Sequence, residues 1–159
     1  MSTAPQPRVR LAQTRDAHAV AQLLHHFNEE FGDPTPGPAW LARRIGELLS
    51  AGELTVLLIG EPPDGLAVLR FRPAIFSAAL ECYLAELYVA PGRRGRGLGR
   101  ELLAGVEEVA RSLRAGRIVL DTAAPLLEAA ALYRSAGYRD IPRFNDNPVA
   151  VAWFGKDLA

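Results

Sequence analysis

Apolar residues in the first third of the chain recur at spacings typical of helices. A short alternating stretch at residues 8–13 predicts a strand. Asp16 then precedes a run whose apolar residues share one helical face: Val20, Leu23, Leu24, Phe27 and Phe31. We expect this helix to stop at Gly32. Pro38 is expected to open a second helix that ends near Gly52.

The middle of the chain changes from helical spacing to strand-like apolar runs. Three such runs occupy residues 54–60, 65–76 and 82–90, and turn-forming segments separate them. Strands that follow one another so closely predict a meander of neighbouring strands. Apolar residues then recur at helical spacing from Leu98, and we expect Gly116 to close that helix.

The last part of the chain alternates strand and helix. Residues 117–122 are predicted to form a buried strand, and Pro125 is expected to open a helix that Gly137 caps. Residues 147–158 supply the final strand. With 159 residues, of which 49% are hydrophobic, the chain is expected to fold as a single domain, with residues 1–7 as a flexible tail.

Charge and composition narrow the classes of function. The 18 basic residues balance the 18 acidic ones, so no general attraction to nucleic acid or to an anionic membrane is expected. The amino terminus lacks the apolar core of a signal peptide, and no apolar run is long enough to span a bilayer, which predicts a cytoplasmic protein. The single cysteine, Cys82, lies among apolar neighbours and is expected to be buried and inert.

Glycine and arginine are concentrated in one stretch, Val89 to Leu103, which holds four residues of each type. It lies between a predicted strand and a predicted helix, so its backbone N–H groups should converge at a helix N-terminus, a geometry that binds anions. The dinucleotide fingerprint fails, because its third glycine would fall on Arg100 or Leu102. The Walker pattern fails too, because no lysine and hydroxyl pair follows Gly97.

The stretch does contain R-x-x-G-x-G, from Arg94 to Gly99, and here the sequence resembles the GNAT superfamily of acyl-CoA-dependent N-acyltransferases. A second segment resembles the family's A-x-x-L-Y-x-x-x-G-[FY] pattern, which is satisfied by Ala129, Leu132, Tyr133, Gly137 and Tyr138. The resemblance implies an α/β (α+β) fold with a mixed, mostly antiparallel sheet of about six or seven strands and about four flanking helices. It also implies a splayed parallel pair at residues 84–89 and 118–121.

The resemblance implies a binding site for acetyl-CoA. Main-chain groups of Leu87, Tyr88 and Val89 would hold the pantetheine arm. The pyrophosphate would be lined by Arg94, Gly95, Gly97, Leu98, Gly99 and Arg100. Many relatives carry asparagine where this chain has Leu126, so one side-chain contact to CoA is expected to be missing.

Two residues are the candidate catalytic groups. Glu86, on the predicted central strand, would accept the proton of the amine, directly or through water; Glu81 is the rival, and water alone is a third alternative. Tyr133 matches the family's tyrosine near the CoA sulfur and would protonate the leaving thiolate. No metal is predicted.

The predicted function is direct transfer of an acetyl group to a primary amine, either a small molecule or a peptide. A non-catalytic CoA sensor or partner-binding module is the alternative, and RNA binding by the glycine-arginine stretch is disfavoured by the absence of net charge. Glu29 or Glu30 could attract a cationic amine, although solvation of a helix end explains them more simply. The acceptor, the acyl chain length and the oligomeric state stay open, with a homodimer among the options.

Overall fold

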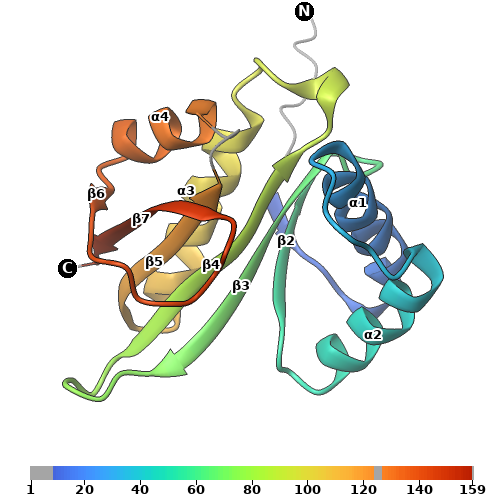
Figure 1. Cartoon of the computed structure of the whole chain (residues 1–159). Coiled ribbons are helices and arrows are strands. Elements are labelled where there is room, and N and C mark those ends of the chain that lie inside the picture. The colour runs from blue at the N-terminus through green and yellow to red at the C-terminus, as the bar shows by residue number, and fades with distance from the viewer. Residues whose placement is uncertain (1–8, 124–126, 159) are drawn as a thin grey trace, which may run out of the picture. The chain divides into compact units, whose positions relative to one another are not determined.

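The computed structural model describes residues 9–123 and 127–158 (Figure 1). Seven strands form a sheet in the order β1-β2-β3-β4-β5-β7-β6. Strand β5 runs parallel to β4 and antiparallel to β7, and β1 runs antiparallel to β2. The strands are β1 Val9–Leu11, β2 Thr55–Ile59, β3 Gly65–Pro73, β4 Leu80–Val89, β5 Ala115–Ala123, β6 Arg139–Asp140 and β7 Ala150–Asp157. The predicted mixed, mostly antiparallel sheet is confirmed.

Four α-helices accompany the sheet within the described residues, as predicted. They are α1 Ala17–Glu30, α2 Pro38–Ser50, α3 Leu98–Ser112 and α4 Leu127–Ser135. Two short 3-10 helices are added, η1 Thr14–Asp16 and η2 Pro91–Arg93. The sequence did not predict either of them.

The chain divides into two compact units. Unit 1 comprises Met1–Val68 and Glu86–Gly105, and unit 2 comprises Leu69–Ala85 and Val106–Ala159. Strands β3 and β4 and helix α3 each contribute to both units. The single domain expected for residues 1–159 stays a prediction.

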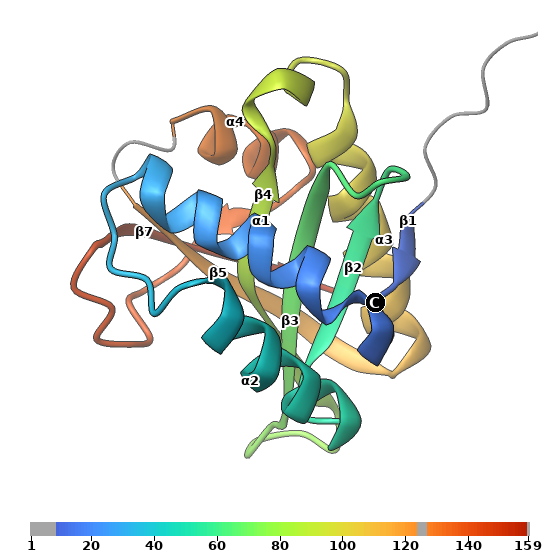
Figure 2. The ribbon, with the colours of Figure 1, turned by 90° about the vertical axis from the view of Figure 1, so that its right-hand side faces the viewer.

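In unit 1, α1 and α2 pack against each other and cover one face of strand β2 (Figure 2). Val20 and Ala21 of α1 are fully buried, as are Leu58 and Ile59 of β2, so the apolar stripe that predicted α1 is the face that packs. Gly37 precedes α2 with φ of 94°, and Pro38 occupies its first turn, as the sequence predicts.

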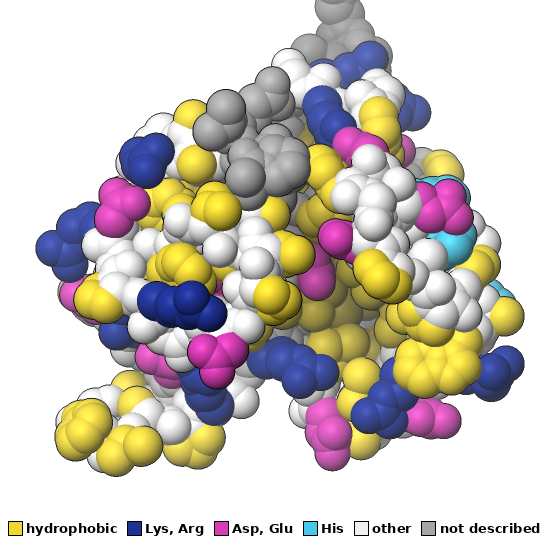
Figure 3. Space-filling view, viewed as in Figure 1, with side chains coloured by type: hydrophobic (Ala, Val, Ile, Leu, Met, Phe, Trp, Pro, Cys, Tyr) yellow, Lys and Arg dark blue, Asp and Glu magenta, His cyan; other side chains and the backbone are white. Residues whose placement is uncertain are grey.

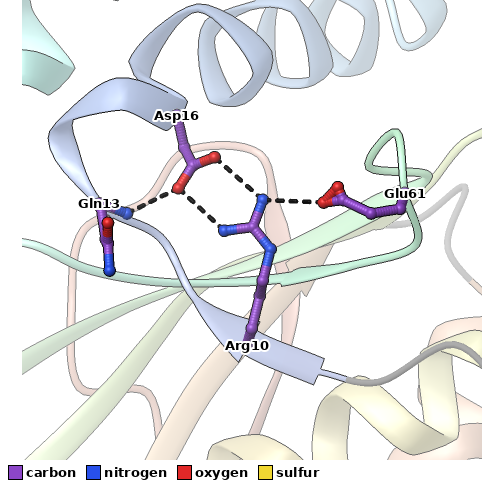
Figure 4. A network of polar contacts seen from close by, with 4 residues as sticks. All are labelled: Arg10, Gln13, Asp16 and Glu61. Carbon is purple, nitrogen blue, oxygen red and sulfur yellow. Dashed lines mark hydrogen bonds and ion pairs between the residues drawn. The ribbon is translucent and has the colours of Figure 1, made fainter.

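A polar network fastens the start of α1 to strand β1 (Figure 4). Arg10 donates two hydrogen bonds of 2.9 Å to the Asp16 carboxylate, which also accepts the Gln13 amide at 2.8 Å. Glu61 adds a third acceptor for Arg10, at 3.2 Å. The bonds from Arg10 lower the pKa of Asp16 to about 2, so this carboxylate stays ionised and paired under ordinary conditions.

In unit 2, β5 lies between β4 and β7. Its antiparallel register with β7 runs from Arg117↔Asp157 to Ala123↔Ala150. Ile118 of β5 and Phe154 of β7 are fully buried, as expected for a central strand and its neighbour. The expected splay from β4 falls where β4 passes from one unit to the other, so it stays a prediction.

The predicted end of helix α3 is wrong. The helix stops at Ser112, and Gly116 lies inside strand β5. Arg114 takes the left-handed conformation in place of a glycine, with φ of 60°. A Cβ on Gly116 would lie 3.2 Å from Cβ of Ala79, so the glycine serves a close approach between neighbouring segments.

The predicted strand at residues 65–76 is too long. Strand β3 ends at Pro73, and Ile75 and Phe76 lie in the connection to β4 with 89% and 99% of their surfaces exposed. Figure 3 shows hydrophobic side chains gathered at this hairpin, at the lower left of the view. Apolar residues there resemble a strand in sequence, yet the connection turns back before they can pair.

The last helix and strands agree with the sequence, with one addition. Gly137 ends α4 with φ of 92°, and the Tyr138 amide donates to the Tyr133 carbonyl at 3.0 Å. The two-residue strand β6 was not predicted. The expected helix start at Pro125, the departure at Leu126 and the tail of residues 1–7 lie outside the described residues.

Candidate functional site

The predicted site residues are divided between the two units. Glu86 and the cofactor-binding candidates from Leu87 to Arg100 belong to unit 1, whereas Tyr133 and Glu81 belong to unit 2. All of them lie among the described residues.

The glycine-rich loop of unit 1 joins strand β4 to helix α3, as the sequence predicts. Gly95 and Gly97 have φ of 80° and 81°, a conformation that residues with a Cβ rarely adopt. A Cβ on either glycine would meet nothing within 4 Å, so backbone conformation rather than crowding requires glycine here. Helix α3 begins immediately afterwards at Leu98, which is buried.

The loop presents backbone donors. Among the residues that the structure describes, no acceptor is recorded for the amides of Gly95, Arg96 and Gly97. The first turn of α3 adds N–H groups that an α-helix leaves without an internal partner. Donors gathered at a helix N-terminus suit the pyrophosphate of CoA, so the residues present fit this cofactor.

Arg94 is held by several hydrogen bonds beside this loop. Its guanidinium donates to both Glu30 carboxylate oxygens at 2.8 Å and to the Val89 carbonyl at 2.9 Å. The Tyr88 hydroxyl donates to the same carboxylate at 3.0 Å. The structure therefore brings Tyr88, Val89 and Arg94 together, with Glu30 from the end of α1 as a partner that the sequence had assigned only tentatively to substrate attraction.

The Glu30 contacts change the acid-base properties of their members. Hydrogen bonds from Arg94 lower the pKa of the Glu30 carboxyl. Burial, with the bond to Glu30, raises the pKa of Tyr88 to about 12. The Tyr88 ring stacks on Phe27, with centroids 4.6 Å apart, which adds apolar packing to the polar contacts.

The two candidate bases have different surroundings. Glu86 is half-buried on β4. Glu81 accepts two N–H groups of Arg72, at 2.8 and 2.5 Å. A carboxylate paired with arginine is stabilised in its ionised form, which makes it a weaker proton acceptor.

Tyr133 is buried on helix α4, with 5% of its surface exposed. Its ring centroid lies 5.8 Å from that of Tyr138 and 5.9 Å from that of Phe154. Lys156 closes the end of α4 by donating to the Ala136 carbonyl at 2.8 Å, and it also donates to Glu107 at 2.7 Å. The second motif therefore builds a rigid support for the tyrosine.

Sequence reasoning missed a polar network around Asp121 of β5. Its carboxylate accepts the Tyr83 hydroxyl, the Asn145 amide and the Asn147 amide, each at 2.7 Å. These asparagines lie in the segment between β6 and β7, which is drawn in orange to red in Figure 1. The only signal in the sequence was an aspartate directly after three apolar residues in a predicted buried strand.

Other chemistry finds little support in the part of the chain described. Cys82 is fully buried, as expected, and burial raises the pKa of its thiol to about 12. No group of three or more metal-ligating side chains occurs among residues 9–123 and 127–158. No helix in these ranges is both long and apolar enough to cross a membrane.

Comparisons with known proteins agree with the fold and the motifs. Residues 13–138 match the acetyltransferase (GNAT) family. The chain is 29% identical over 160 residues to the uncharacterized N-acetyltransferase YjgM of Escherichia coli (strain K12), covering 87% of this chain and 86% of that protein. The uncharacterized N-acetyltransferase YhfO of Bacillus subtilis (strain 168) is 27% identical over 137 residues, covering 83% of this chain and 89% of that protein.

Solved structures give the same picture. A candidate acetyltransferase from Arthrobacter sp. FB24 has a TM-score of 0.76 and 41% identity, covering 92% of this chain and 91% of that one. The aminoglycoside N-acetyltransferase AAC(6')-Iy, solved in complex with CoA, has a TM-score of 0.75 at 15% identity, which shows the fold alone; it covers 91% of this chain and 95% of that one. With the family matched over residues 13–138, the chain belongs to the GNAT family and is an N-acetyltransferase.

Proposed function

We propose that this N-acetyltransferase moves an acetyl group from acetyl-CoA to a primary amine by direct transfer in a ternary complex. The observation that carries the proposal is the loop before α3, in which Gly95 and Gly97 adopt left-handed conformations. The family membership supports an acyl-CoA donor. Bound acetyl-CoA would supply a thioester, whose carbonyl carbon accepts the amine nitrogen as the thiol leaves.

Binding would depend on the backbone of the loop. The amides of Gly95, Arg96 and Gly97 and the first turn of α3 would hold the pyrophosphate, with Leu98, Gly99 and Arg100 lining it. A hydrogen bond to a charged group contributes roughly 1.5–3 kcal/mol. Three or four such bonds would reach roughly the 8 kcal/mol of a micromolar complex, before association costs are subtracted. Arg94 would act through its place in the loop, because its guanidinium is bonded to Glu30 and Val89.

The pantetheine arm would lie against the main chain of Leu87, Tyr88 and Val89. Strand β4 contributes these residues to unit 1. The Val89 carbonyl already accepts Arg94, so the remaining main-chain groups of the three residues would make the contacts.

Glu86 would remove the proton of the amine. A primary amine with a pKa near 10.4 is mostly charged at pH 7, and making it neutral costs roughly 4.6 kcal/mol. A half-buried glutamate on β4 could accept this proton directly or through water. Its rival Glu81 is disfavoured by its pair with Arg72.

Tyr133 would donate the proton that the departing thiolate needs. The buried position of the ring supports a fixed orientation of the hydroxyl. Cys82 is unsuited to carry the acetyl group in a covalent intermediate, because its thiol is buried and its pKa is raised to about 12. Direct transfer is therefore preferred.

A thiol-release assay with acetyl-CoA across a library of amines tests the proposal. Tyr133→Phe should slow turnover by roughly 10²-fold or less, because a thiolate leaves fairly well unaided. Glu86→Gln should reduce turnover most at low pH, where the amine is fully charged. Unchanged turnover in either variant would reject the role given to that residue.

Calorimetry with CoA separates binding from catalysis. Gly97→Ala should weaken CoA binding, because alanine is strained at a φ of 81°. Gly92→Ala is the matched control, since Gly92 lies in the same loop without a positive φ and has open space around its Cβ position. Wild-type protein that binds CoA but acetylates no amine would favour the non-catalytic sensor.

A further inference from the structure

Asp121 of unit 2 is a half-buried carboxylate with an unusual set of partners. It accepts the hydroxyl of Tyr83 and the amides of Asn145 and Asn147, all at 2.7 Å. All three donors are neutral. Among the residues that the structure describes, no cationic side chain lies within ion-pair distance of Asp121.

The carboxylate has acceptor capacity left. Two oxygens of an ionised carboxylate can accept about four hydrogen bonds. Oδ2 accepts Tyr83 and Asn145, whereas Oδ1 accepts only Asn147 among the described residues. One further N–H donor could therefore bind Oδ1 without displacing any protein group.

The two asparagines are themselves fixed in place. Asn145 accepts the Trp153 indole N–H at 2.9 Å, and Asn147 accepts the Val149 amide at 3.3 Å. Each asparagine thus has its side-chain oxygen occupied and its amide turned toward Asp121. The carboxylate is consequently held in one orientation before any ligand arrives, as a binding site requires.

The surroundings of Asp121 suit a cation. The Tyr83 ring meets Phe144 edge to face, with centroids 6.0 Å apart. The nearby cation, Arg143, is engaged elsewhere: it lies over Trp153, donates to the Asn145 carbonyl at 2.8 Å and pairs with Asp146 at 3.6 Å. Aromatic rings beside an unneutralised carboxylate favour an ammonium group.

We propose that Asp121 binds a second cationic group of the acceptor, distinct from the amine that is acetylated. An ammonium paired with a carboxylate keeps its proton, so it has no lone pair for attack on a thioester. The nitrogen at Asp121 therefore differs from the nucleophile. The acceptor class is diamines and polyamines, that is, amines with at least two positive charges at neutral pH. This inference rests on the proposed acetyltransferase function.

A purely structural role is the competing explanation. In that case Asp121 only fastens the segment between β6 and β7 to strand β5. Both roles predict that Asp121→Asn weakens the fold. Only the binding role predicts a selective loss of affinity for dications.

The test is calorimetry on wild-type protein saturated with CoA. Putrescine and cadaverine are titrated beside butylamine and pentylamine, and spermidine is added as a tricationic probe. We expect the diamines to bind at least about tenfold more tightly than the monoamines, because each gains a charge-assisted hydrogen bond. Equal affinities would overturn the proposal without the use of any variant.

Two variants sharpen the result. Asp121→Asn should abolish the preference for diamines, whereas Asp146→Asn, in the same segment but fully exposed, should retain it. A preference that survives in a folded Asp121→Asn protein would overturn the proposal. CoA affinity is measured first in each protein, so that a failure to bind CoA, which contradicts the proposed function, is distinguished from a failure to select diamines.

Discussion

Glu30 in unit 1 and Asp121 in unit 2 are both partly buried carboxylates, yet their partners differ. Glu30 accepts two hydrogen bonds from the Arg94 guanidinium and one from Tyr88. Asp121 accepts three hydrogen bonds from neutral groups. One carboxylate is neutralised within the protein, and the other keeps its charge.

The difference separates a structural ion pair from a candidate binding group. A carboxylate with a bound arginine has little attraction left for an amine, so Glu30 fastens the loop to the end of α1. The sequence offered Glu29 and Glu30 as possible sites for a cationic acceptor, and the pair with Arg94 makes Glu30 unsuited to that role. Hydrogen bonds alone therefore do not identify a ligand site; the charge of the donors decides.

Removing the charge of Glu30 should have the largest effect on stability. Glu30→Gln would leave the partly buried Arg94 guanidinium without its counter-ion, and we expect a loss of about 2 kcal/mol in the free energy of unfolding. Urea denaturation measures it. Glu29→Gln, an exposed neighbour paired only with His25, is the control and should change stability far less. Equal losses in the two variants would contradict the assignment.

The contribution of Glu30 should also depend on pH, by no more than the preceding loss. Arg94 lowers the pKa of Glu30 in the folded protein. The stabilisation is therefore fully present above the pKa of an unfolded glutamate and disappears as the pH falls through the lower folded value. The stability difference between wild type and Glu30→Gln should shrink on acidification. A difference that stays constant down to strongly acidic pH would exclude the ion pair as its source.

Asp121→Asn should cost less, about 1 kcal/mol. Asparagine keeps the shape and one acceptor oxygen, and the Tyr83 hydroxyl can reverse its hydrogen bond, so no charge is left uncompensated. Thermal and urea unfolding give the value. A loss larger than that of Glu30→Gln would remove the contrast between the two carboxylates.

An exposed ion pair sets the lower limit of the series. Arg72 has 56% of its side chain exposed and pairs with Glu81. Arg72→Ala should change the free energy of unfolding by about 0.5 kcal/mol or less, because water screens such pairs. A loss of the size expected for Glu30→Gln would show that the pair is much better shielded from water than its exposure suggests.

Local patterns predicted most of the fold and the position of the cofactor loop. Helical spacing located α1, and the glycines at 95 and 97 marked a conformation that few other residues adopt. The end of α3 was missed because Arg114 adopts a left-handed conformation, which no local pattern announces for arginine. The exposed Ile75 and Phe76 were misread for a related reason, since apolar character alone does not show where a strand loses its partner.

The contacts around the two carboxylates could not be predicted. Arg94 lies 64 residues after Glu30, and Asn145 and Asn147 lie 24 and 26 residues after Asp121. Such pairings depend on how strands and connecting segments come together. A single sequence carries no signal for the side chains that will meet across that distance.

The Arg94 side chain has a consequence for ligand binding. One guanidinium joins the last residue of strand β4 to the last turn of α1, so the backbone beside the glycines is fixed by hydrogen bonds at both ends. A loop that is already ordered loses little conformational entropy when it closes around an anion. Flexible glycines supply the curvature, and the arginine keeps that curvature ready in the free enzyme.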